Sequence, residues 1–501
     1  MSATQTGKNI RRNAIAGASQ TALSAILLFC LYRYINYALG VEYLGVWSVV
    51  LALSSVSSLA DLGFSAGLTK FVAKYVSLNR PFKVVALVDT VTISMAMVII
   101  LLTLIMLPLA YYLSDVIFDD PYSHFAKTIL PIAFISVVFN ITASASLGGL
   151  AGLGRIDAKS LLLFASQAIF LLATFVLVPL LDFEGLAFAQ LLSSFFLLVT
   201  ARLVLRYNHQ YFTIIPVVWR VEVISEIWRY GAQYQLALVM RMLLDPVTKG
   251  LLASFAGPLY VGYFEMATQI IAKAKNMLVS ANHAIVPYVS SNLNNQQFDI
   301  KEFYCSNFEI FSKASLLLFS LIVSCAGLMS WILLGENNSV FILLFLILSF
   351  AWMLNSFSGP AHLLNLATGK LWLSTISTLL MAISNIFFCS LLGFYLGGLG
   401  VAIGYALSIT LGGLLLLWLV NRDLGLMCKD VFSSWMIFHI VIVVLAICNA
   451  TYLFYLLEDS QLIYALLFPV AVIMLVFVAV FVDPILRKIV LGILMRSISK
   501  D

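Results

Sequence analysis

The chain has 501 residues, of which 62% are apolar and only 10% are charged, and its formal net charge is +5. An average soluble domain is about 25% charged, so a water-soluble fold of this length could not cover its surface with so few charges. The composition excludes soluble enzymes, nucleic-acid-binding proteins and secreted disulfide scaffolds. It predicts a polytopic helical membrane protein.

Long apolar stretches follow one another along the whole chain. Each is close to the ~20 residues that an α-helix needs to cross a ~30 Å hydrocarbon core. We predict fourteen spans, with approximate cores at 14–39, 44–66, 85–113, 128–150, 160–181, 185–205, 230–254, 259–281, 312–334, 339–365, 371–395, 399–420, 434–456 and 461–482.

Basic residues fix the predicted orientation of these spans. When the links are assigned alternately to the two sides, Lys127 is the one basic residue in an outer link, and the inner links hold nearly all the others. Cytoplasmic links carry an excess of Lys and Arg in membrane proteins. Both termini are therefore predicted to be cytoplasmic, with the basic amphipathic segment 485–500 along the inner leaflet.

Two pairs of segments reveal an internal repeat. Residues 40–47 (GVEYLGVW) align with 257–264 (GPLYVGYF) at an offset of 217, and 185–193 (GLAFAQLLS) align with 400–408 (GVAIGYALS) at an offset of 215. A unit of six spans keeps both copies in the same orientation, so the pseudo-two-fold axis runs along the membrane normal. Repeats of this kind are typical of transporters.

We therefore predict an all-α fold of two six-helix lobes. The N-lobe is 1–206, a cytoplasmic linker is 207–227, the C-lobe is 228–422, and 423–501 holds the last two helices and the amphipathic segment. No nucleotide-binding or hydrolase motif is present, so we expect neither an enzyme nor a cofactor or metal site.

Charged residues inside spans mark the candidate cavity. Each costs roughly 3 kcal/mol at the bilayer centre unless it faces protein or water. The candidate ligands of an anionic substrate are Arg33, Arg241, Lys249 and Lys273, and the candidate ion-coupling or charge-tuning residues are Asp61, Asp245 and Glu265. They lie in the first, second, seventh and eighth spans, which the repeat pairs with one another.

Local spacing leaves structural roles open for several of these residues. Arg241, Asp245 and Lys249 share one helix face, and Arg241 with Asp245 could be a structural ion pair. Asp61, Asp89 and Glu265 lie near span ends and could cap or snorkel. Arg33, Lys249 and Lys273 have no obvious local partner in the sequence, and Lys275 points away from Lys273.

The tenth span carries Asn355, Pro360, His362 and Asn365, which together predict a broken helix. For His362, packing is a more common role than titration.

Several short motifs resemble those of one transporter family. YLGVW at 43–47, DLGF at 61–64 and KFVAKY at 70–75 are similar to the first hairpin of bacterial polysaccharide transporters, and FAGPLYVGYFEMA at 255–267 is similar to their turn between the seventh and eighth spans. These are the O-antigen and exopolysaccharide flippases of the multidrug/oligosaccharidyl-lipid/polysaccharide exporter superfamily.

The resemblance implies a V-shaped pair of lobes in the bacterial inner membrane. It implies that the protein flips an undecaprenyl-diphosphate-linked oligosaccharide, with Arg33, Arg241, Lys249 and Lys273 as diphosphate or sugar-acid ligands. It further implies H⁺ or Na⁺ as a counter-ion, and polysaccharide polymerase and chain-length machinery as partners besides the membrane lipids.

Two alternatives share the fold: a drug/cation antiporter and a flippase of lipid II or another peptidoglycan precursor. The antiporter should have a cavity dominated by carboxylates and aromatic residues. A membrane glycosyltransferase or polymerase should have large outer loops with clustered catalytic residues, whereas the outer links here are short.

The orientation is directly testable. Reporter fusions after residues 118, 183, 337 and 459 are expected to report the outside, and fusions after 81, 156, 215 and 425 the inside, because the inner links are basic. An inside result at 337 or 459 would contradict the fourteen-span topology.

Overall fold

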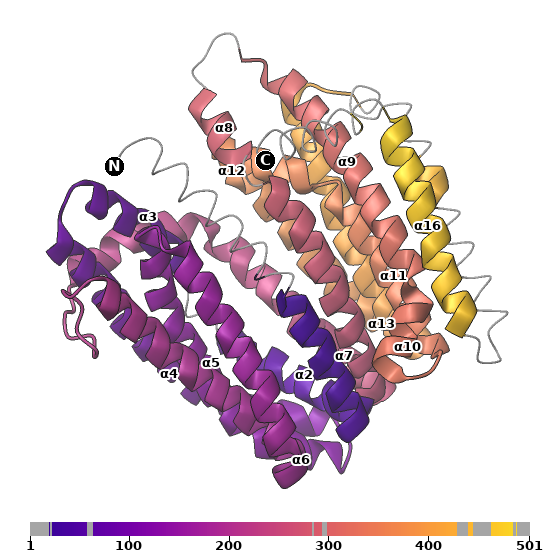
Figure 1. Cartoon of the computed structure of the whole chain (residues 1–501), viewed down its shortest axis with the longest axis horizontal. Coiled ribbons are helices and arrows are strands. Elements are labelled where there is room, and N and C mark those ends of the chain that lie inside the picture. The colour runs from indigo at the N-terminus through magenta and orange to yellow at the C-terminus, as the bar shows by residue number, and fades with distance from the viewer. Residues whose placement is uncertain are drawn as a thin grey trace, which may run out of the picture. The chain divides into compact units, whose positions relative to one another are not determined.

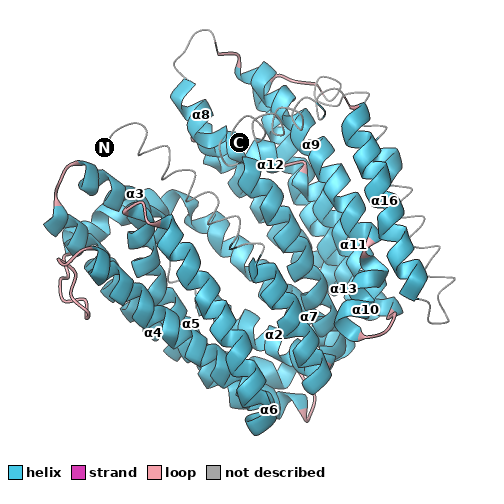
Figure 2. Ribbon diagram, in the orientation of Figure 1, coloured by secondary structure: helices cyan, strands magenta, loops and turns pink. Residues whose placement is uncertain are grey.

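The computed structural model describes residues 20, 23–57, 64–282, 285–292, 298–427, 439–443, 462–483 and 487. All the regular elements in these ranges are helices, and the described part of the chain has no strand (Figure 2). This confirms the all-α prediction. The chain divides into two compact units, Met1–Gly262 and Tyr263–Asp501.

In the first unit, α5 is the central helix of a bundle and packs against α2, α3, α4 and α6 (Figure 1). The helices are Leu23–Ala38, α2 (Val41–Ser55), α3 (Phe64–Ser77), α4 (Pro81–Ile117), α5 (Tyr122–Gly152), α6 (Ile156–Asn208) and α7 (Val221–Asn282), which continues into the second unit.

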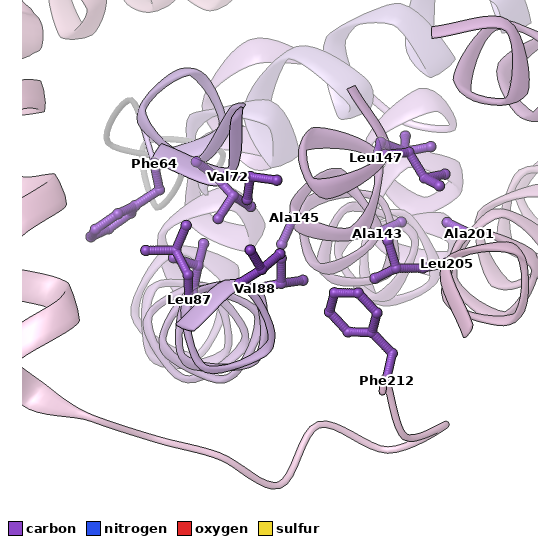
Figure 3. Packing of buried hydrophobic residues seen from close by; sticks show 14 of the residues in the cluster. Phe64, Val72, Leu87, Val88, Ala143, Ala145, Leu147, Ala201, Leu205 and Phe212 are labelled. Carbon is purple, nitrogen blue, oxygen red and sulfur yellow. The ribbon is translucent and has the colours of Figure 1, made fainter. Parts of the chain in front are cut away.

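The core of this bundle is made of aliphatic and small side chains from α3 to α6. Val72, Val88, Ala145 and Leu205 are fully or almost fully buried there, and Phe212 closes the cluster from the segment that follows α6 (Figure 3). Small residues on α5 allow this close packing, because packing between helices within a membrane depends on close van der Waals contact.

In the second unit, α9 packs against α11, α12 and α16, and α13 packs against α11 and α12. Its helices after α7 are α8 (Ile285–Asn292), α9 (Ile300–Ser324), α10 (Ala326–Leu334), α11 (Ser339–Ser356), α12 (Gly359–Thr368), α13 (Leu371–Leu424) and α16 (Leu462–Val482).

The tenth predicted span is broken, as the sequence predicts. α11 ends at Ser356 and α12 begins at Gly359, with Pro360 in the first turn of α12. Proline fits a first helical turn because it has no N–H to leave unsatisfied. At the break, the backbone N–H and the hydroxyl of Ser358 both donate to the Asn355 carbonyl oxygen.

Six helices of the described residues are long and apolar enough to cross a membrane: α4, α5, α6, α9, α11 with α12, and α13. α6 and α13 have 53 and 54 residues, and each covers two predicted spans. The amphipathic segment 485–500 and most of the thirteenth span lie outside the described residues, Arg487 and 439–443 excepted.

The internal repeat is visible in the backbone. Three pairs of positions at the repeat offsets have positive φ in both copies: Gly40 and Gly257, Gly154 and Gly369, and Asp182 and Gly397. Asp182 (φ 49°, ψ −130°) and Gly397 (φ 58°, ψ −139°) break α6 and α13 between their two predicted spans. Positive φ is uncommon for a residue with a side chain, so the match at Asp182 indicates the same turn in both copies.

The hairpins that these breaks form within α6 and α13 also match. A Cβ added at Gly185 would overlap the carbonyl oxygen of Leu177, and one added at Gly400 would overlap that of Leu392. Each glycine faces the residue eight positions before it, so both hairpins close so tightly that only glycine fits.

The first pair of matched turns makes a reciprocal contact. A Cβ at Gly45 would overlap the carbonyl oxygen of Pro258, and a Cβ at Gly262 would overlap the carbonyl oxygen of Val41. Val41 and Pro258 are themselves 217 residues apart, as are the two glycines. The repeat therefore supplies a self-complementary contact of backbone against backbone.

A buried ion pair fastens the segment after α6 to the first bundle. Arg202 Nη2 on α6 lies 2.6 Å from Asp89 Oδ1 on α4, with side chains 7% and 0% exposed. Arg202 Nε donates to the Thr213 carbonyl, and the Val217 N–H donates to Asp89 Oδ2. Asp89 therefore acts in tertiary structure, across 113 residues from its partner.

This pair gives a stability prediction. Asp89→Ala is expected to lower the free energy of unfolding by about 3–5 kcal/mol, because it leaves the Arg202 charge buried without its counter-charge. Unfolding of the purified protein in detergent measures the effect. Asp423→Ala, which breaks the exposed pair with Lys370, is the matched control and should cost at most about 1 kcal/mol. Equal losses in the two variants would contradict the assignment.

Candidate functional site

The first group of candidate residues lies on α7 before its break at Gly257. Lys249 Nζ is 2.7 Å from Asp245 Oδ2, and the Lys249 side chain is 6% exposed whereas that of Asp245 is 55% exposed. The sequence shows no obvious partner for Lys249, and the structure corrects this: Asp245, one turn earlier, pairs with it. Burial explains the choice, because a buried ammonium group requires a counter-charge.

Arg241 lies one turn before Asp245 on the same face and is exposed. Arg33, on the helix Leu23–Ala38, is also exposed. The first unit therefore presents two exposed guanidinium groups and one buried, carboxylate-paired ammonium group. Asp61 lies outside the described residues.

The second group lies on α7 after its break. Glu265 is 6% exposed, and its Oε1 accepts a hydrogen bond of 3.0 Å from Gln269 Nε2, one turn along the helix. Lys273, a further turn along, is half-buried. The Glu265, Gln269 and Lys273 positions therefore form one polar stripe in the second unit, as their four-residue spacing predicts.

Lys275 has a different environment from Lys273. Its ammonium group lies 3.8 Å from the centroid of the Trp352 ring and donates a 3.0 Å hydrogen bond to Asn355 Oδ1. Asn355 Nδ2 in turn donates to the Ile409 carbonyl. Lys275 thus connects α7, α11 and α13, which is a packing role.

The tenth-span polar residues also act in packing. His362 Nδ1 lies 3.3 Å from Ser374 Oγ, and Asn365 Nδ2 donates to the same hydroxyl. This favours the packing role for His362.

Sequence reasoning missed a second buried ion pair. Lys313 Nζ on α9 lies 2.8 Å from Asp483 Oδ2, directly after α16, and 2.7 Å from Glu309 Oε1. Lys313 and Asp483 are both fully buried. In the sequence, Lys313 and Asp483 look like ordinary charged residues at the ends of two predicted spans. Their charge at these ends is the one feature from which a pairing could have been suspected.

Among the described residues, no group of three or more His, Cys, Asp or Glu side chains is placed to hold a metal ion. The candidate residues on α7, before and after its break, offer charged and hydrogen-bonding groups. Exposed arginines can bind phosphate or carboxylate groups in bidentate fashion, and lysines can serve as point charges.

Solved structures identify the fold as that of the MOP superfamily of transporters. An inward-facing multidrug-resistance transporter of the MATE family matches with a TM-score of 0.69 at 15% identity, covering 82% of this chain and 98% of its own. The lipid II flippase MurJ, in an inward closed conformation, matches with a TM-score of 0.69 at 14% identity, covering 95% and 99%. A MOP superfamily transporter from Pyrococcus furiosus, whose binding pocket is described as having reverse polarity, matches with a TM-score of 0.56 at 15% identity, covering 83% and 96%.

The chain therefore has a fold that solved membrane transporters share, and its long apolar helices indicate a multi-pass membrane protein. Residues 10–293 match the family model of polysaccharide biosynthesis proteins, and the chain belongs to that family. The resemblance seen in the sequence is confirmed by both comparisons. A sequence search of proteins with curated functions gave no match.

The contrast between two neighbouring lysines is testable. Lys275→Ala is expected to lower the free energy of unfolding by about 2 kcal/mol, because it removes a cation–π contact and a hydrogen bond. Thermal unfolding of the purified protein measures the loss, and Lys273→Ala is the matched comparison with a smaller effect. An unchanged stability in Lys275→Ala together with lost transport would contradict the packing role.

Proposed function

We propose that this protein is a flippase that moves an undecaprenyl-diphosphate-linked oligosaccharide repeat unit from the inner to the outer leaflet of the bacterial inner membrane. It would serve O-antigen, exopolysaccharide or capsule synthesis. The observation that carries the proposal is the membership of the polysaccharide biosynthesis family together with the excess of cations among the charged residues within its spans.

The proposed topology has fourteen transmembrane helices with both termini in the cytoplasm. The N-lobe is 1–206, the linker 207–227 and the C-lobe 228–422, and 423–501 adds the last two helices. Arg202 and Asp89 hold the linker against α4 and α6. This contact supports treating the linker as part of the inner end of the first lobe.

In this proposal Arg33, Arg241, Lys249 and Lys273 bind the diphosphate or acidic sugars in a central cavity, and the polyprenyl chain stays in lipid. Arg33 and Arg241 are exposed, so a phosphate group can reach both side chains. Lys249 is paired with Asp245, which holds its charge in place until an anionic ligand competes for it.

Asp61, Asp245 and Glu265 are the proposed charge-tuning or counter-ion residues, with H⁺ or Na⁺ as the ion. Of the two that the structure describes, Asp245 is the better placed to exchange between Lys249 and an ion, because its carboxylate is partly exposed. Glu265 is buried and accepts a hydrogen bond from Gln269. This contact supports a role in fixing the position of the Gln269 side chain on the same helix face.

Alternating access would open and close the reciprocal contact between Gly45, Pro258, Val41 and Gly262. Only glycine allows the two backbones to lie this close at these positions, so the contact is made by backbone rather than by charged side chains at Gly45 and Gly262. Such a contact can separate without leaving an unpaired ion in the membrane.

The membrane potential supplies a driving force for this direction of movement. A diphosphate diester carries about two negative charges, and each is worth ~2.3 kcal/mol per 100 mV. With the interior negative, outward movement of the head group gains up to about 4–5 kcal/mol per ~100 mV. The cations of the cavity are then required to offset desolvation rather than to drive transport.

Two alternatives share the fold. The lipid II flippase is favoured by the match to MurJ over 95% of this chain, and a drug/cation antiporter by the match to the MATE transporter. The carboxylate-dominated cavity expected of the antiporter is not what the candidate residues offer, since Arg33, Arg241, Lys249 and Lys273 outnumber their acidic neighbours.

A reconstituted flipping assay with imposed membrane potentials tests the proposal. Arg241→Ala and Lys249→Ala are each expected to reduce flipping of a diphosphate-linked oligosaccharide about 10-fold or more without lowering protein abundance, because the loss of one charge-assisted contact costs about 1.5–3 kcal/mol. Lys275→Ala is the control and should keep its activity per folded molecule.

Substrate choice in the same vesicles separates the alternatives. Transport of lipid II in place of the oligosaccharide would support the peptidoglycan function, and exchange of a cationic dye would support the antiporter. Full activity in both Arg241→Ala and Lys249→Ala would contradict the diphosphate cavity, whatever the response to voltage.

A further inference from the structure

A cavity of about 700 Å³ lies at the C-terminal end of α13, within the second unit. Leu414, Leu417, Trp418 and Met427 form its apolar walls, and Arg422 lies in the lining. Its volume is in the ~300–1,000 Å³ range of small-molecule sites. The positive-inside pattern assigns this end of α13 to the cytoplasmic side.

An exposed apolar strip leads along α13 to the cavity. Leu407, Leu411, Leu414 and Trp418 are 41%, 40%, 45% and 51% exposed. Their spacing of four, three and four residues places them on one helix face, and the next position on that face is Arg422. An acyl chain in the bilayer can therefore follow the strip until it reaches a cation.

Two cations lie near the end of this strip. The Arg422 guanidinium lies 5.4 Å from the centroid of the Trp418 ring. The Lys301 ammonium lies 3.7 Å from the point that a Cβ on Gly425 would occupy, and Gly425 is part of the cavity wall. The residues named as lining this cavity include no carboxylate. The nearby Asp423 carboxylate is bound to Lys370 at 2.6 Å.

This arrangement belongs to the second copy of the repeat only. At the offset of 215, Leu203 and Tyr207 stand where Trp418 and Arg422 stand in α13. The feature is therefore not a consequence of the repeated fold. An apolar strip that ends at two cations complements an anionic amphiphile, and basic pockets on the cytoplasmic side of membrane proteins bind anionic lipid head groups.

We propose that this cavity binds one anionic phospholipid of the inner leaflet, with its phosphate against Arg422 and Lys301 and an acyl chain along Leu414 and Trp418. A phospholipid is the favoured occupant because the strip is open to the bilayer along its length, so that a lipid can enter from the side.

Brominated lipids test the site through Trp418, because bromine quenches the fluorescence of a tryptophan that it touches. The full chain is reconstituted in phosphatidylcholine bilayers that contain increasing amounts of brominated phosphatidylglycerol or, in parallel, brominated phosphatidylcholine. The Trp418 signal is the difference between the protein and its Trp418→Phe variant.

We expect phosphatidylglycerol to quench Trp418 at a lower mole fraction than phosphatidylcholine does. Each cation near the surface is worth about 1 kcal/mol, or roughly five-fold in affinity. Arg422→Gln should therefore reduce the preference about five-fold, and Lys301→Gln should reduce it in the same direction. Arg206→Gln, which removes an exposed arginine at the end of the repeat-related α6, should leave the preference unchanged.

Three results would overturn the proposal. One is equal quenching by the two lipids in the unmodified protein, and another is an undiminished preference in both Arg422→Gln and Lys301→Gln. The third is displacement of brominated phosphatidylglycerol by an equimolar amount of undecaprenyl phosphate, which would assign the site to a polyprenyl lipid instead. Because Lys301 is exposed, Lys301→Gln keeps the test decisive if Arg422→Gln does not fold. No step in the test depends on flipping.

Discussion

The cost of an ionised group in hydrocarbon is the constraint on which this structure depends. A charge at the bilayer centre costs at least about 3 kcal/mol, and the cost falls only when the charge reaches the interface or meets protein groups that stabilise it. This chain places nearly all its basic residues in links between spans. Several charges within the described helices have specific partners: Asp89 with Arg202, Lys249 with Asp245, and Glu265 with Gln269. The same energetic cost therefore explains both the placement of basic residues in the links and the pairing of charges within the helices.

The buried pairs and the exposed cations have different consequences. Asp89 with Arg202, and Lys313 with Asp483, are buried on both sides. They join helices distant in sequence, and they are costly to break because either partner alone would remain desolvated. Arg33 and Arg241 are exposed, so their guanidinium groups are accessible. Lys249 is intermediate, since it is buried itself but its partner Asp245 is half-exposed. The buried pairs suit a structural role, and the exposed arginines suit a binding surface.

The repeat also supplies close contacts between helix turns, in which backbone lies against backbone. Gly45 and Gly262 let the backbones at Pro258 and Val41 approach more closely than any side chain would allow. Gly185 and Gly400 do the same within the hairpins of α6 and α13. Close backbone contact is a common means of packing in membranes, where the hydrophobic effect does not drive helices together. Duplication of one six-span unit produces both members of each contact at once, which explains their matching offsets.

The sequence by itself determined the helical class, the membrane location, the repeat and the family resemblance. The first two depend on composition and on apolar stretches of about 20 residues, and the other two depend on comparing short segments of sequence, which needs no knowledge of side-chain contacts. It also predicted the break near Pro360 and the shared face of Asp245 and Lys249, since both follow from local helix geometry. Only the tertiary structure decided that Asp245 is paired with Lys249, that Lys275 rests on Trp352, and that Asp89 meets Arg202. The partners of Lys275 and Asp89 depend on which helices pack and at what rotation, and the pairing of Asp245 with Lys249 rather than Arg241 follows from the burial of Lys249. Hydropathy and residue spacing do not reveal that rotation, because a helix that is apolar on all sides has little hydrophobic periodicity to distinguish its faces.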